Sequence, residues 1–140
     1  MYQGIDFRAQ ARELQKTICL PEAAKDPRTM LAAAYLANNK LLTPLLVGTS
    51  EDLRKDAEAA GLSLDLVRCI DPFSYERFDE MVEMYRQRRA KENLSKENAA
   101  ELLRDPLFFG AMLVAMGEAD GMVGGAIHST THMGLSLIHI

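Results

Sequence analysis

The chain has 140 residues, of which 48% are hydrophobic and 26% are charged, and its formal net charge is −4 at pH 7. This balance is typical of a globular domain and excludes a largely disordered chain. The negative charge argues against non-specific nucleic-acid binding, because such binding needs a basic face to neutralise phosphates. No run of about 20 apolar residues occurs, so the sequence predicts no membrane-spanning helix.

The polar N-terminus, residues 1–16, lacks the apolar core of a signal peptide, and a cytoplasmic location is expected. Cys19 and Cys69 fall in predicted strands. Their favoured interpretation is two reduced, buried thiols that act as small hydrophobic groups. A redox pair is the alternative, and the spacing gives it no support.

Short apolar runs alternate with longer amphipathic stretches from the start of the chain. The pattern predicts a helix over residues 7–15 and a strand over 17–20, which Pro21 ends. Asp26 is expected to be an N-cap, with Pro27 at the first helical position, so a second helix should run to about residue 39.

The spacing of apolar residues in this second helix places Leu31, Ala34, Tyr35 and Leu41 near one face. A strand is predicted over residues 44–47. Ser50 is then expected to cap a helix over residues 51–60, which Gly61 ends.

The rest of the chain repeats the pattern. A strand is predicted over residues 66–70, Ser74 is expected to open a charged helix over 75–90, and Ser95 to cap another over 96–103. Asp105-Pro106 should start a helix over 107–117, and Met122-Val123 forms a last short strand before Gly124-Gly125.

Strand–helix alternation with apolar strands predicts an α/β fold, a parallel sheet with helices on both faces in three layers. The sequence shows no internal repeat and no low-complexity linker. The chain is therefore interpreted as one α/β domain, or most of one.

Ligands of an open parallel sheet bind at the carboxyl ends of its strands, which here are residues 21–29 and 121–130. In the second segment Gly124 and Gly125 allow a tight turn, and the hydroxyls of Ser129 and Thr130 with backbone N–H groups suit an anion such as phosphate. A plain strand-to-helix turn with Ser129 as N-cap explains the same residues equally well. The segment is neither a P-loop nor a dinucleotide fingerprint.

Isolated basic and imidazole side chains are weaker candidates. Arg28 could reach an anion at the first strand end, and Arg88, with Arg89 and Lys91, could form an anion-binding edge. Each is better explained, from the spacing alone, as a solvated helix residue. His128 and His132 have the spacing of a metal pair on a helix, but no third ligand is evident, so no metal is predicted.

Several blocks resemble the phosphate acetyltransferase and phosphate butyryltransferase family. They are Pro21-Glu22, Asp26, Arg28-Thr29, residues 44–48, Tyr85 to Arg88, residues 105–114 and residues 117–130. The resemblance runs from about Lys16 to Thr130.

This resemblance implies acyl transfer between coenzyme A and inorganic phosphate, with coenzyme A as a substrate and with no bound cofactor, metal or covalent intermediate. It assigns Gly124, Gly125, His128, Ser129 and Thr130 to the acyl phosphate cleft. Arg88 matches an arginine linked to substrate binding in the family, and Arg28 lies in the matching first segment. The family's catalytic base comes later in its sequences, so no catalytic residue is expected in this chain. Family members tend to be dimers or larger, so a homo-oligomer that acts on small molecules is expected; charge and hydropathy predict no nucleic acid or membrane partner.

The end of the chain departs from the family, which has an aspartate and an arginine where His132 and Leu135 stand. Residues 135–140 also match the translation of a transposon end used in sequencing libraries. We therefore expect residues 134–140 to be a non-native tail, the natural gene to continue past about Met133, and this piece to be inactive alone. The alternatives are a regulatory domain like that of some malic enzymes, or a non-catalytic anion-binding module.

Overall fold

The computed structural model describes residues 6–125. Its sheet has four parallel strands in the order β3-β2-β1-β4. The strands are β1 (Thr17–Leu20), β2 (Thr43–Val47), β3 (Arg68–Ile70) and β4 (Gly121–Met122). The helices are α1 (Phe7–Leu14), α2 (Pro27–Asn38), α3 (Ser50–Ala59), α4 (Phe78–Arg88), α5 (Lys96–Leu103) and α6 (Pro106–Ala115), with single 3₁₀ turns at Leu64–Leu66 and Ala90–Glu92.

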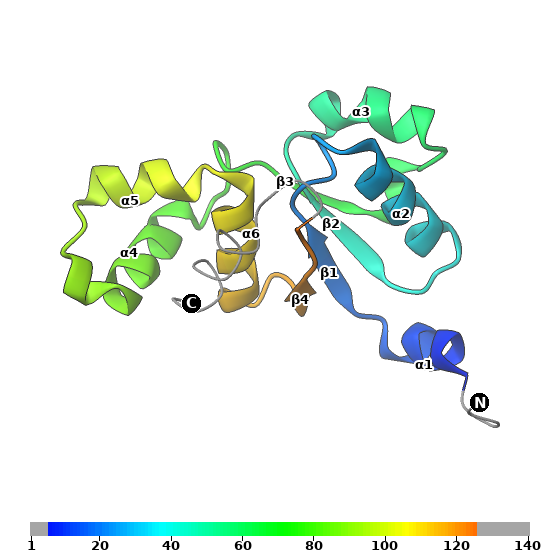
Figure 1. Ribbon diagram of the computed structural model, residues 1–140, viewed down its shortest axis with the longest axis horizontal. Coiled ribbons are helices and arrows are strands. Elements are labelled where there is room, and N and C mark those ends of the chain that lie inside the picture. Colours follow the sequence, from blue (N-terminus) through cyan, green and yellow to red (C-terminus); the bar gives the residue numbers. More distant parts are fainter. Residues whose placement is uncertain (1–5, 126–140) are drawn as a thin grey trace.

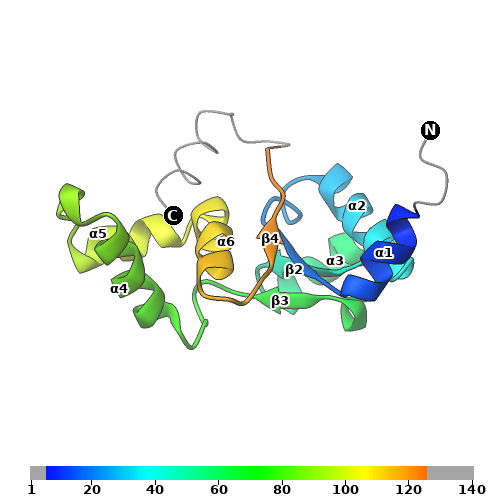
Figure 2. The same ribbon diagram turned by 90° about the horizontal axis from the view of Figure 1, so that it is seen from below.

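Helices cover both faces of this sheet, which confirms the predicted three-layer α/β fold. Helices α2 and α3 lie on one face, and α6 lies on the other with α4 and α5 packed beyond it (Figures 1 and 2). Cys19 and Leu45 point toward α6, whereas Leu20 and Leu46 point toward α2 and α3. All four side chains are buried, as expected for strands covered on both sides.

The start of α2 follows the sequence prediction. The Asp26 side chain accepts a hydrogen bond from the Arg28 N–H, and Pro27 occupies the first turn. The apolar face predicted for this helix is half right, because Ala34 and Leu41 are buried whereas Leu31 is 56% and Tyr35 47% exposed.

The face of α2 that meets the sheet is built from Met30 and three alanines, Ala33, Ala34 and Ala37. Small side chains let the helix approach the sheet closely. Because these residues also repeat at helical spacing, the sequence contained two apolar stripes, and tertiary packing chose the one with less bulk.

Two boundaries in the next segment differ from prediction. Thr49, not Ser50, caps α3, and its hydroxyl accepts the Asp52 N–H at 3.0 Å. Thr49 and Ser50 both carry a hydroxyl that could cap a helix. Thr49 is the cap because α3 begins at the residue that follows it. The strand predicted over 66–70 is shortened to Arg68–Ile70, because Ser63 caps the 3₁₀ turn that precedes it.

The start of α4 was also predicted too early. The Ser74 hydroxyl donates to Asp71 Oδ2 at 3.4 Å in a turn, and the helix begins at Phe78. Ser95 and Asp105 cap α5 and α6 as predicted. Strand β4 lies one residue earlier than expected, with Gly121 opposite Ile18.

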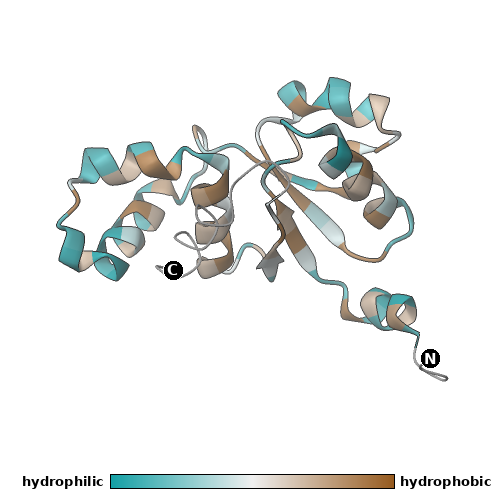
Figure 3. Ribbon diagram, in the orientation of Figure 1, coloured by the Kyte–Doolittle hydropathy of each residue, from teal (hydrophilic) through white to brown (hydrophobic). Residues whose placement is uncertain are grey.

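Helix α6 is apolar around most of its circumference because it lies between the sheet and the α4–α5 pair. Figure 3 shows it largely in brown, whereas the outer turns of α3 and α4 are teal. Gly110 permits its close approach to the sheet. A Cβ atom there would stand 3.0 Å from Cys19 Sγ and 3.2 Å from Met122 Sδ.

Candidate functional site

The sheet has a topological switch point between β1 and β4. The chain leaves β1 toward β2 through α2 on one face, and it returns to β4 from α6 on the other face. The loops after β1 and β4 therefore diverge at the carboxyl edge of the sheet, where ligands of open α/β folds bind. A pocket of about 290 Å³ lies between them, lined by Leu20, Glu22, Asp26, Arg28, Thr29, Ala32, Val123 and Gly124.

Asp26 organises the α2 side of this switch-point pocket. Its Oδ1 accepts from Arg28 Nε at 3.2 Å, and its Oδ2 accepts from Thr29 Oγ1 at 3.0 Å. The hydrogen bond from the Arg28 side chain lowers the pKa of Asp26, and the Thr29 hydroxyl and Arg28 backbone N–H act in the same direction against burial. Asp26 is therefore ionised at neutral pH and orients Arg28, whose side chain is 76% exposed.

Glu22 joins the two walls of the pocket. Its side chain is buried, with 1% of its surface exposed, and its Oε1 accepts the Gly125 backbone N–H at 2.7 Å. Its own carbonyl accepts the Lys25 and Asp26 N–H groups within the turn after β1. Glu22 is not among the site residues predicted from the sequence. The available signal was a carboxylate placed two residues past the last buried residue of a strand.

The structure brings some predicted site residues together and separates others. Arg28 and Gly124 line the pocket, and Gly125 adjoins it through Glu22. Arg88 ends α4 on the far side of α6, and it does not line the pocket. His128, Ser129 and Thr130 lie outside the described residues, as do His132 and the proposed tail, residues 134–140.

The predicted anion-binding edge beside Arg88 is occupied by local contacts. Arg89 donates to Tyr85 Oη at 2.6 Å, pairs with Glu92, and its guanidinium lies 5.4 Å from the centre of the Tyr85 ring. These contacts fix the end of α4. Whether Arg88 contacts a substrate stays a prediction.

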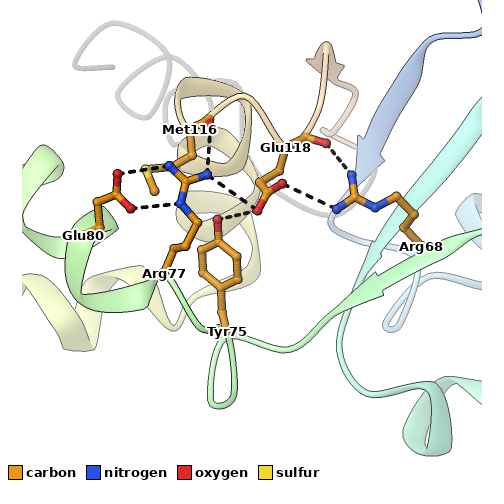
Figure 4. Close-up of polar contacts among 6 residues, drawn as sticks. All are labelled: Arg68, Tyr75, Arg77, Glu80, Met116 and Glu118. Carbon is orange, nitrogen blue, oxygen red and sulfur yellow. Dashed lines mark hydrogen bonds and ion pairs between the residues drawn. The ribbon is translucent and has the colours of Figure 1, made fainter.

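A second polar cluster, centred on Glu118, ties the α4–α6 layer to the sheet (Figure 4). Glu118 Oε2 accepts from Tyr75 Oη at 2.7 Å, and its carboxylate pairs with Arg68 at 3.5 Å and Arg77 at 3.9 Å. Arg77 also binds Glu80 through two nitrogens. Burial and the Glu118 contact raise the pKa of Tyr75, so the phenol stays a donor.

A larger pocket, of about 430 Å³, lies between α2 and α3, and its lining is mostly alanine, proline, methionine and leucine. It has fewer converging polar groups than the switch-point pocket. Among residues 6–125, no three His, Cys, Asp or Glu side chains are grouped to hold a metal ion. No helix within the same range is long and apolar enough to cross a membrane.

A parallel sheet with a pocket at its switch point is the arrangement in which open α/β folds bind small ligands, at the carboxyl edge of the strands. Residues 6–139 match the family described as Phosphate acetyl/butaryl transferase. The chain belongs to this family, as its sequence motifs indicated.

Individual relatives agree with this assignment. The phosphate acetyltransferase of Thermoanaerobacterium thermosaccharolyticum is 36% identical over 124 residues, which are 89% of this chain and 37% of that protein. That of Bacillus subtilis is 39% identical over 113 residues, 81% of this chain and 34% of that protein. A phosphotransacetylase crystal structure from Streptococcus pyogenes has a TM-score of 0.86 and 38% identity, with 96% of this chain and 40% of that chain covered. The chain thus spans well under half the length of these relatives.

Proposed function

We propose that this chain supplies the phosphate-binding side of an enzyme that transfers an acyl group between coenzyme A and inorganic phosphate. The observation that carries the proposal is the switch-point pocket, with Arg28 and Gly124 in its walls, in a chain of this family. The substrates are small molecules, with coenzyme A as a substrate rather than a bound cofactor.

In the proposed reaction the coenzyme A thiolate attacks the carbonyl carbon of an acyl phosphate. A carbon–sulfur bond forms, the carbon–oxygen bond to phosphate breaks, and phosphate leaves as an anion. Arg28 supplies positive charge at the phosphate end of the pocket, and Asp26 keeps its guanidinium oriented. By the family resemblance, His128, Ser129 and Thr130 complete the contacts with the acyl phosphate. Arg88, which lies away from this pocket, is linked by the same resemblance to substrate binding.

The base that deprotonates coenzyme A is proposed to come from sequence outside these 140 residues. Residues 1–133 then form the binding part of a longer, cytoplasmic homo-oligomer, and residues 134–140 are a non-native tail. On this basis we expect the isolated chain to bind phosphate and acetyl phosphate without forming acetyl-CoA.

Calorimetric titration of the 140-residue chain with phosphate tests the binding proposal. We expect Arg28→Ala to weaken phosphate binding about tenfold, because it removes a charged hydrogen-bond donor. The control is Arg54→Ala, which removes another exposed arginine, in α3 and away from the pocket. It should leave the phosphate affinity unchanged.

Incubation of the same chain with acetyl phosphate and coenzyme A provides the second measurement. Formation of acetyl-CoA would show that these residues are catalytically sufficient and would contradict the proposed division of labour. Absence of phosphate binding would instead remove the proposed function of the pocket.

A further inference from the structure

We propose that Glu22 is a positioning residue, whose buried carboxylate anchors the glycine segment after β4 and so shapes the switch-point pocket. The inference rests on the proposed function for its ligand, phosphate. Glu22 does not contact the reacting atoms in this proposal. It acts through the backbone at Gly125.

The contact between Glu22 and Gly125 lies where strand pairing ends. The last described hydrogen bond between this segment and β1 comes directly after β4, where the Val123 N–H donates to the Cys19 carbonyl at 3.0 Å. Beyond this point the sheet no longer holds the chain. The next backbone N–H of this segment with a described hydrogen bond is that of Gly125, which donates to Glu22 Oε1 at 2.7 Å. Glu22 therefore takes over where strand pairing ends.

The backbone of Gly125 has a conformation that favours glycine. Gly125 has φ of +108°, a region that side chains disfavour, and a Cβ atom there would meet nothing within 4 Å. Glycine is needed for the backbone angle and not for space. The bond from Glu22 selects this one conformation from the many that paired glycines allow, which lowers the entropy lost when a ligand binds.

Burial of the Glu22 side chain costs free energy, because the side chain is charged. A buried carboxylate is unfavourable unless donors satisfy it, so an apolar residue would be the simpler choice in this core. Glu22 also accepts two N–H groups at its own carbonyl in the turn after β1. One residue thus links both walls of the pocket, across 103 positions of sequence.

Electrostatics and positioning predict opposite signs for phosphate affinity. A carboxylate beside a bound phosphate repels it, so a purely electrostatic role means that removing the charge strengthens binding. If Glu22 positions the pocket, Glu22→Ala should weaken phosphate binding about tenfold, a loss typical of a charged hydrogen bond.

Two conservative variants separate geometry from charge. Glu22→Gln keeps an oxygen acceptor at the same reach, and it should bind phosphate at least as well as the unaltered chain. Glu22→Asp keeps the charge but withdraws it by about 1.5 Å, and it should behave like Glu22→Ala. Glu118→Gln is the matched control, because it alters a carboxylate that links two segments away from the pocket.

The experiment combines phosphate titration of the 140-residue chain with amide hydrogen exchange at Gly125, read by NMR. We expect exchange at Gly125 to be at least about tenfold faster in the Ala and Asp variants and unchanged in the Gln variant. Unchanged exchange in Glu22→Ala, or Asp restoring phosphate affinity better than Gln, would overturn the proposal. If the unaltered chain binds no phosphate while exchange still responds, the proposed function fails and the anchoring contact stands.

Discussion

At the residue scale, Glu118 shows how one carboxylate joins separate parts of the fold. It accepts from Tyr75 and pairs with Arg68 and Arg77, and it is only 22% exposed. We expect Glu118→Ala to lower the free energy of unfolding by about 2 kcal/mol, because it leaves the Tyr75 hydroxyl and both guanidinium groups without this acceptor. Urea denaturation measures the change.

Glu118→Gln should cost about half as much, since the amide oxygen can still accept from Tyr75. The control is Glu83→Ala, which breaks a surface pair with Arg86 of 2.8 Å. Exposed pairs contribute less than about 1 kcal/mol, so this control should be near neutral. Equal losses at the two glutamates would show that the Glu118 cluster gives no more than a surface pair.

At the element scale, the packing of α6 on the sheet depends on Gly110. In an exposed helix, Gly→Ala stabilises by about 1 kcal/mol. Here the added Cβ meets Cys19 Sγ, Met122 Sδ and Pro21 Cβ at 3.0 to 3.2 Å, so neighbours from β1 and β4 must shift. Overpacking costs about 1–3 kcal/mol, and we expect Gly110→Ala to be destabilising by about 1 kcal/mol overall.

A double-mutant cycle with Cys19→Ala tests this explanation. Removing the sulfur atom makes room for the new methyl group, so the two changes together should cost less than the sum of their separate costs. Strictly additive losses in thermal unfolding would mean that Gly110→Ala acts through some other contact.

The difference between local and long-range contacts explains which elements could be predicted from the sequence. Caps at Asp26, Ser95 and Asp105 depend on hydrogen bonds within three residues, so local sequence was sufficient. The buried face of α2 depends on contacts with the sheet and with α3, which local patterns do not contain.

At the scale of the whole molecule, the sequence predicted which segments meet at the carboxyl edge of the sheet, but not the hydrogen bonds that join them. The alternation of strands and helices predicted the carboxyl edge, and the segments containing Arg28 and Gly124 do meet there. The bond between Glu22 and Gly125 joins residues 103 positions apart, and it could not be predicted until the strand order was known.

The centre of the sheet provides a probe of global unfolding. Cys19 lies in β1 between β2 and β4, and burial raises its pKa to about 12. Only the thiolate reacts with a disulfide reagent, so at pH 8 Cys19 should react only in unfolded molecules. Burial also raises the pKa of Cys69, but Cys69 is less buried than Cys19. Its modification should therefore be faster than that of Cys19. Kinetics with Cys69→Ala isolate Cys19.

The raised pKa also predicts a loss of stability in alkali. The unfolded chain ionises Cys19 above about pH 8.5, whereas the folded chain keeps the proton up to about 12. Between these values the unfolded state binds fewer protons, so the free energy of unfolding should fall as pH rises. Cys19→Ala should show a shallower fall than the unaltered chain in urea denaturation from pH 8 to pH 10. Identical slopes would mean that folding does not raise the pKa of Cys19, whereas rapid labelling of native Cys19 would mean that the sheet opens around this residue without global unfolding.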